Sequence, residues 1–270
     1  MTRRSFVAAG LGAFATSDSY SFWVFGLLHP TRLNLYAQGT ARLPVESTDG
    51  TRILEGPEPM SVDAALAPLN VGGPVGFVLE IPGVIRRPYF GRLRISATGS
   101  LLRPVVSMSR EVAVGSIVGA EMPAQGTPLQ ALATQAVATR SFLVAGAGHA
   151  RHGDAQFCDT THCQFLRAPA ESGSVVDKAV RATRGMLLSA GRRVIAAHYS
   201  TACGGRTESA ELDHYQYRAV FCETCRTAGV ARKGPGLGLC QTGAIGLARA
   251  GWSYRRILEK YYAGCVIRND

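Results

Sequence analysis

The sequence predicts an α+β fold, with strands in the first hundred residues and helices after them. Runs such as Phe77–Ile81 and Leu93–Ile95 are strand-like, and clusters of glycine and proline separate them. From Ser109 onward the apolar residues recur at helical spacing instead. This change of pattern predicts a small β-rich domain over residues 21–99 and a mainly helical domain with β-hairpins over residues 100–270.

The ends of the helices can be placed from capping residues. Ser109 is positioned to cap a helix that runs to Glu121. Thr127 is positioned to cap a second helix, with Pro128 at its first helical position and Gly146 at its end. The remaining expected elements are a helix from Ser174 to Gly185, a hairpin of Met186–Ser189 with Val194–Tyr199, and helices over Ala244–Arg249 and Ser253–Tyr262.

The first twenty residues have the pattern of a signal peptide. Arg3 and Arg4 precede the apolar stretch Val7–Ala15, which ends in Ala13-Phe14-Ala15. The paired arginines suggest the twin-arginine export route; the alternative is a basic tag before the first strand. The stretch is too short for a membrane-spanning helix, which needs ~20 residues. We therefore expect residues 1–20 to direct export to the periplasm or cell wall, with no transmembrane span.

The overall charge narrows the classes of partner. The net charge is +10, and only 18% of the residues are charged, which is a globular composition. A basic surface favours acidic partners such as a wall polymer, anionic lipid or nucleic acid. Because the basic residues are scattered and no nucleic-acid-binding motif is present, we expect no nucleic acid partner.

Glu121 is the first candidate for chemistry. Positions 114, 118 and 121 fall on one face of the expected helix, and the other two are the valines Val114 and Val118. A carboxyl at the end of an apolar stripe tends to have a raised pKa, because burial disfavours its charged form. Such a group can serve as a general acid near neutral pH. The alternative is a helix-terminal glutamate that reaches solvent.

A group of histidines and cysteines is the second candidate. His152, Cys158, His162 and Cys163 lie within twelve residues of one another. Two nitrogen and two sulfur ligands suit a tetrahedral zinc site. His149 could replace His152 in such a site. A disulfide between Cys158 and Cys163, with ordinary surface histidines, is the alternative.

The remaining cysteines allow two interpretations. Cys203, Cys222, Cys225 and Cys240 could form a second metal site or two disulfides, and Cys265 leaves an odd total of seven. Export favours disulfides. Export of an already folded protein by the twin-arginine route would favour metal instead, because folding would then occur in the reducing cytoplasm.

A glycine-rich loop follows, and other catalytic signatures are absent from the sequence. Residues 234–241 read Gly-Pro-Gly-Leu-Gly-Leu-Cys-Gln, where glycines allow close approach of backbone to a ligand or form a tight turn. The spacing is not a dinucleotide-binding fingerprint. The serine-nucleophile pattern G-x-S-x-G does not occur. A cysteine nucleophile, Cys158 or Cys163, is a further alternative.

Five segments, taken together in their order, resemble one known family. They are Glu111-Val112 with Gly119-Ala120-Glu121-Met122-Pro123 and Gln130–Phe142, then Cys158–Gln164, Tyr199–Glu208, the glycine-rich loop with Gln241-x-Gly243-Ala244, and Ile257–Gly264. This set resembles the signature of the SpoIID/LytB family, that is, stage II sporulation protein D and amidase-enhancer proteins. The resemblance covers residues 101–267.

The resemblance implies a lytic transglycosylase of peptidoglycan, or a relative that enhances a wall amidase. The catalytic glutamate of the family falls on Glu121, and its zinc cluster falls on His152, Cys158, His162 and Cys163, where zinc would be structural. We expect the separate motifs to converge around Glu121 in the folded protein. The motif residues expected to bind substrate there are Arg140, Gln164, Tyr199, Ser200 and Gln241.

One departure from the family leaves a second function open. Family members usually have Gly-His-Gly in the glycine-rich loop, whereas this chain has Gly234-Pro235-Gly236. Glycan cleavage by Glu121 is therefore weighed against a non-catalytic protein that binds peptidoglycan strands or activates a wall hydrolase or amidase. A third class, a zinc-dependent hydrolase, fits less well because four protein ligands leave zinc no open position for water.

Overall fold

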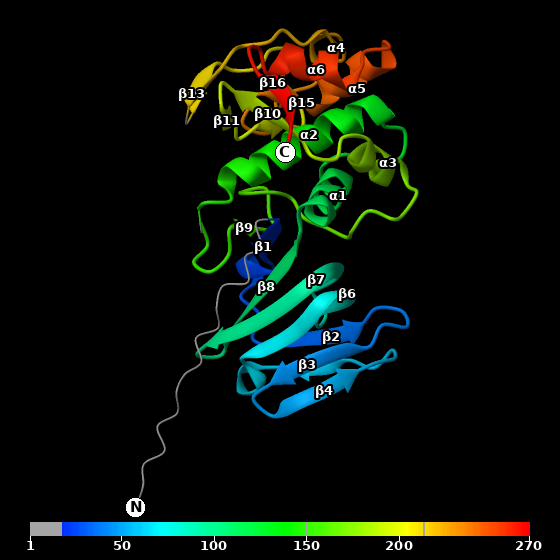
Figure 1. Ribbon diagram of the computed structural model, residues 1–270, viewed down its shortest axis with the longest axis vertical. Helices are drawn as coiled ribbons and strands as arrows, with labels where there is room; N and C mark the ends of the chain where they lie inside the picture. Colours follow the sequence, from blue (N-terminus) through cyan, green and yellow to red (C-terminus); the bar gives the residue numbers. More distant parts are fainter. Residues whose placement is uncertain (1–17, 150, 213) are drawn as a thin grey trace, which may run out of the picture.

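The computed structural model describes residues 18–149, 151–212 and 214–270. They form a large sheet at one end of the molecule and a helical part at the other (Figure 1). The predicted α+β class is confirmed. Residues 1–17, most of the expected signal peptide, lie outside the described residues. Ser19 and Tyr20, its last residues, instead belong to the first strand of the sheet, and Tyr20 is buried.

The large sheet is built mainly from the first part of the chain. Its strands are β1 (Ser19–Trp23), β2 (Leu33–Ala37), β3 (Leu43–Ser47), β4 (Gly50–Leu54), β5 (Met60–Val62), β6 (Leu69–Ile81), β7 (Ile85–Thr98), β8 (Leu101–Ser109) and β9 (Phe157–Cys158). The order is β4-β3-β6-β7-β8-β1-β9, and β2 pairs with β5 and β6. In β7 the buried Leu93 and Ile95 alternate with the exposed Arg92 and Arg94, as a half-buried strand requires.

This sheet does not end at residue 99, where the sequence pattern placed a domain boundary. β8 pairs with both β7 and β1, and β9 is added at the edge as a parallel partner of β1. The change from strand to helix occurs at Ser109, because β8 runs directly into the first helix (Figure 1). The turn at Gly99 only reverses the chain between two strands, and local pattern alone does not distinguish such a turn from a linker.

The helical part is arranged around one central helix. Its helices are α1 (Arg110–Glu121), α2 (Leu129–Gly146), α3 (Val175–Ala182), α4 (Glu223–Thr227), α5 (Gln241–Arg249) and α6 (Tyr254–Tyr261). Its short strands are β10 (Met186–Ala190), β11 (Arg193–Val194), β12 (Tyr199–Ser200), β13 (Ala210–Leu212), β14 (Tyr215–Tyr217), β15 (Leu239–Cys240) and β16 (Val266–Asn269). α2 is buried along most of its length between α1 and α3 on one side and α5 and α6 on the other.

Two local predictions need correction. Thr127 does not cap α2; its hydroxyl donates to the carbonyl of Pro123, and Pro128 occupies the capping position. The expected hairpin is reduced to two residue pairs between β10 and β11. The main partner of β10 is β16, which local sequence patterns could not reveal because it lies far along the chain.

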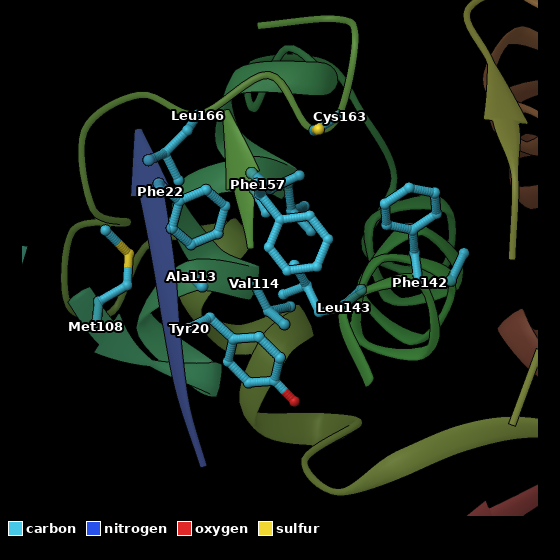
Figure 2. Packing of buried hydrophobic residues seen from close by; sticks show 14 of the residues in the cluster. Tyr20, Phe22, Met108, Ala113, Val114, Phe142, Leu143, Phe157, Cys163 and Leu166 are labelled. Atoms are coloured by element: carbon cyan, nitrogen blue, oxygen red, sulfur yellow. The ribbon is translucent and has the colours of Figure 1, made fainter. Parts of the chain in front are cut away.

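An aromatic cluster joins the sheet to the helices. The ring of Phe157 lies 5.6 Å from that of Phe22 in β1 and 6.2 Å from that of Phe142 in α2, measured between centroids. Figure 2 shows Phe157 between these side chains, with Val114 and Leu143 below it. Burial of such large rings fixes β9, and with it the polar segment that follows, against both parts of the molecule.

Candidate active site

Glu121 is the last residue of α1, and its carboxyl is half-buried. Oε1 accepts a hydrogen bond from the backbone N–H of Phe165 at 3.0 Å. Burial raises the pKa of the Glu121 carboxyl, although the Phe165 N–H, the side chains of Tyr199 and Gln241 and the charge of Arg167 oppose this shift. The negative end of the α1 dipole also disfavours the charged form. The protonated form of Glu121 is thus more favoured than that of an exposed glutamate.

Tyr199 and Gln164 form the polar group beside this carboxyl. The Tyr199 hydroxyl donates to Gln164 Oε1 at 2.6 Å, and Gln164 Nε2 donates to the carbonyl of Cys163 at 2.8 Å. The second bond fixes the orientation of the amide, so that its oxygen faces Tyr199. Burial, and then the Glu121 charge, raise the pKa of Tyr199 well above its usual value, so the hydroxyl stays neutral.

The single hydroxyl proton of Tyr199 has two acceptors, Gln164 Oε1 and the Glu121 carboxyl. When Glu121 is protonated, its own O–H can donate to the Tyr199 oxygen while Tyr199 donates to Gln164. When Glu121 is charged, the Tyr199 proton is best directed at the carboxylate. The pair can therefore satisfy both protonation states of Glu121 by one rotation of a hydroxyl.

Two further polar residues, which the sequence patterns did not single out, complete this network from α2. Gln241 Nε2 donates to Gln135 Oε1 at 3.3 Å, and Gln135 Nε2 donates to Thr139 Oγ1 at 3.1 Å. Thr139 in turn hydrogen-bonds to Tyr199 and lowers its pKa. Gln135 and Thr139 are fully buried. Their i, i+4 spacing on a largely buried helix was the available signal, since buried polar groups need partners.

Ser200 positions the glycine-rich loop. Its Oγ accepts from the backbone N–H of Gly236 at 2.8 Å, and the parallel pairing of β12 with β15 sets Tyr199 opposite Leu239. The close approach requires glycine: a Cβ on Gly238, whose φ is +64°, would lie 2.1 Å from the carbonyl oxygen of His198. Ser200 thus connects the strand that carries Tyr199 to the loop that leads to Gln241.

Arg140 is not beside Glu121, and the expectation that it binds substrate there needs correction. Its side chain is fully buried and pairs with Glu111 through Nε at 2.8 Å and Nη2 at 2.7 Å. The remaining donors reach the carbonyls of Ala136, Val180 and Met186. Glu111 lies at the opposite end of α1, about 15 Å from Glu121 along the helix axis. Arg140 therefore holds α1, α2 and α3 together.

The four residues expected to bind metal converge in the structure. His152 Nε2 lies 3.1 Å from Cys163 Sγ, and His162 Nδ1 lies 3.4 Å from Cys163 Sγ and 3.8 Å from Cys158 Sγ. Around a tetrahedral zinc ion, the distance between a nitrogen and a sulfur ligand would be about 3.5 Å. All four donor atoms lie within 4.8 Å of one another, and the cysteines are not bridged. This cluster, which does not include His149, can hold a metal ion.

The same cluster is tied to the sheet and to the active site. On one side, Cys158 pairs with Trp23 of β1, and the buried Asp159 accepts from the Phe25 N–H at 3.3 Å and from Arg87 at 2.8 Å. On the other side, Cys163 is followed directly by Gln164 and Phe165, which contact Tyr199 and Glu121. A metal here would fix the segment that contacts both Tyr199 and Glu121.

Comparison with known proteins supports the resemblance seen in the motifs. Residues 99–189 match the model of the SpoIID family, described as stage II sporulation protein. The matched segment contains Glu121 and the first metal cluster, whereas Tyr199, Ser200 and Gln241 follow it. This family is associated with sporulation and the cell wall. No curated protein matches the chain. Within the described residues, none of the helices combines the length and the hydropathy needed to cross a bilayer.

Proposed function

We propose that this chain, whose residues 99–189 match the SpoIID family, is a lytic transglycosylase that cleaves the glycan strands of peptidoglycan. The observation that carries the proposal is the environment of Glu121. Burial raises the pKa of its carboxyl, Tyr199 and Gln241 hydrogen-bond to it, and Gln164 is bonded to Tyr199. A carboxyl with a raised pKa and neutral hydrogen-bonding neighbours suits the role of general acid.

The reaction can use this one carboxyl twice. Glu121 gives its proton to the glycosidic oxygen, and the bond from that oxygen to C1 breaks with the electron pair leaving on the oxygen. The resulting carboxylate then takes the proton of the sugar's own C6 hydroxyl, whose oxygen forms a new bond to C1. The product is a 1,6-anhydro sugar, and no water is consumed. This differs from glycosidases that need two carboxylates.

Tyr199 supports both halves of this cycle. While Glu121 holds its proton, Tyr199 donates to Gln164; once that proton is transferred, Tyr199 can donate to the new carboxylate. Fixed dipoles usually raise a reaction rate by stabilising charge at the place where it develops. We assign Gln164, Tyr199 and Gln241 to the polar group that supports the Glu121 carboxyl and, through it, the bound substrate, and Ser200 to the positioning of the adjacent loop.

The metal cluster has a structural role in this proposal. His152, Cys158, His162 and Cys163 would hold zinc through four protein ligands, which leaves no open position for an activated water. The ion would stabilise the fold of the segment 152–165. We further propose that residues 1–17, which precede β1, direct the protein to the periplasm or cell wall by the twin-arginine route, in keeping with a peptidoglycan substrate.

Product analysis tests the proposal. Purified glycan strands incubated with the protein should yield fragments that end in 1,6-anhydro-N-acetylmuramic acid, detected by mass spectrometry. Fragments with reducing ends would instead indicate hydrolysis and a second, unrecognised carboxylate. If the strands bind but nothing is released, the alternative function holds, a protein that binds peptidoglycan or activates a wall amidase. The exposed Pro235, in place of the usual histidine, favours that alternative.

The pH dependence of cleavage should follow the raised pKa of Glu121. Because the acid acts in its protonated form, the rate should fall as the pH rises through the pKa of the folded protein, which lies above the usual glutamate value. The same shift affects stability: the protonated form is favoured by folding, so stability is lost as the pH rises from the unfolded to the folded pKa. Replacing Glu121 by glutamine removes this dependence.

The stability measurement is independent of activity. The free energy of unfolding of Glu121→Gln minus that of the wild type should increase as the pH is raised from below the unfolded pKa through the folded one. Denaturant titrations at a series of pH values give this difference. A difference that stays constant with pH would show that the Glu121 pKa is the same in the folded and unfolded chain.

A further inference from the structure

We propose that Cys203, Cys222, Cys225 and Cys240 form a second structural zinc site, with four thiolate ligands. The four sulfur atoms lie within 4.8 Å of one another, although the cysteines come from three separate segments of the chain. All four side chains are almost completely buried. This cluster is distinct from the first one and shares no residue with it.

The distances fit a tetrahedral ion. With zinc–sulfur bonds of 2.3 Å, neighbouring sulfurs of a regular tetrahedron would be about 3.8 Å apart. The Sγ of Cys240 lies 3.9 Å from that of Cys222 and 3.5 Å from that of Cys225. A tetrahedral set of four sulfurs is typical of zinc or iron. We assign zinc rather than iron, because the four cysteines are buried inside the fold and the ion would have a structural role there.

The arrangement does not resemble two disulfides. A pair of disulfides would place the sulfurs two by two at about 2.05 Å, whereas Cys240 is close to two cysteines at once and bonded to neither. Thiolates would repel one another there unless a cation lay between them.

The surroundings supply hydrogen bonds to sulfur, as metal thiolate sites require. The backbone N–H of Gly243 donates to Cys240 Sγ at 3.3 Å, and the Tyr261 hydroxyl donates to Cys222 Sγ at 3.8 Å. There is no room for a larger residue at position 243, because a Cβ on Gly243 would lie 2.7 Å from Cys222 Sγ. A glycine at this position lets α5 approach the sulfurs closely enough to donate.

The site joins the segments that deliver two residues of the active site. Cys203 follows Tyr199 and Ser200 by only a few residues, and Cys240 directly precedes Gln241. Cys222 and Cys225 lie at the start of α4. In the proposed site they bind the same ion as Cys203 and Cys240. If Glu121 acts as proposed above, this zinc ion sets the distance between Tyr199 and Gln241 and hence the hydrogen bonds that both make to the carboxyl.

The metal content of variants tests the proposal without reference to activity. The full-length protein should be purified under reducing conditions without chelator, and its metal content measured by elemental mass spectrometry. We expect two zinc ions per chain, one for each cluster. Cys225→Ser and His162→Ala should each contain one. Cys265→Ser is the matched control, because Cys265 belongs to neither cluster, and it should retain two.

X-ray absorption at the zinc edge identifies the ligands even if Cys225→Ser fails to fold. His162→Ala, which keeps only the second site, should give sulfur neighbours alone at ~2.3 Å. A shell containing nitrogen, the presence of iron, or one zinc ion in the wild type would overturn the assignment. So would alkylation of denatured protein, purified separately without reductant, that leaves these four cysteines unmodified as disulfides. Lack of glycan cleavage would not affect any of these results.

Discussion

Replacing Glu121 by glutamine is expected to lower the rate of glycan cleavage by ~10²–10⁴-fold, the contribution of a positioned acid–base group. Glutamine keeps the oxygen that accepts from the Phe165 N–H. Its amide can also donate to the Tyr199 oxygen, as the protonated acid does. The variant therefore resembles the protonated state in shape and hydrogen bonding, and lacks only a transferable proton. Release of anhydro-muramyl ends from purified strands, followed over time, gives the ratio of rates.

Binding should survive this substitution, which separates catalysis from recognition. Co-sedimentation with glycan strands should be unchanged for Glu121→Gln. Glu171→Gln is the matched control, since Glu171 is exposed in the same part of the chain, and it should cleave like the wild type. Equal cleavage by the wild type and Glu121→Gln would remove Glu121 from the mechanism. Unchanged binding with no cleavage by the wild type would favour the non-catalytic alternative.

Replacing Glu111 by alanine is expected to reduce the free energy of unfolding by about 3–5 kcal/mol, the cost of leaving a buried charge without its partner. Arg140 has no exposed surface, while the side chain of Glu111 is 22% exposed. Removing the carboxylate leaves the guanidinium with only backbone carbonyls as acceptors. Denaturant unfolding monitored by circular dichroism measures the change.

An exposed ion pair provides the control for this measurement. Arg42 and Glu55 are separated by 2.9 Å, but their side chains are 71% and 60% exposed. Glu55→Ala should therefore change the free energy of unfolding by less than about 1 kcal/mol. Replacing both members of the buried pair, as Glu111→Leu with Arg140→Met, should recover much of the loss. If Glu111→Ala costs no more than Glu55→Ala, the pair does not stabilise the helical part.

The elements that the sequence predicted well are those governed by short-range signals. The end of α1 follows from its apolar spacing and the proline after Glu121, and α3 begins at the cap Ser174. The addition of β8 and β9 to one sheet could not be predicted, because pairing between distant strands leaves no local pattern. The same reason hid β16, the partner of β10.

The candidate site was predicted in part for a similar reason. Glu121, Gln164, Tyr199 and Gln241 were found through motifs, and the structure brings them together. Arg140 lies in the same motif as other site residues, yet its side chain points to Glu111, and motif position alone does not give direction. Spacing along the chain also did not decide whether the later cysteines bind metal or form disulfides, since only their convergence in space distinguishes the two.

The pairing of β10 with β16 has a consequence for how the protein is made. β10 directly follows α3, yet its main partner is synthesised only after α4, α5 and α6. A nascent chain released as far as Ser189 therefore carries an unpaired strand edge against the helical core, and such edges promote association with other chains. We expect the helical part to complete its packing only after β16 has emerged from the ribosome.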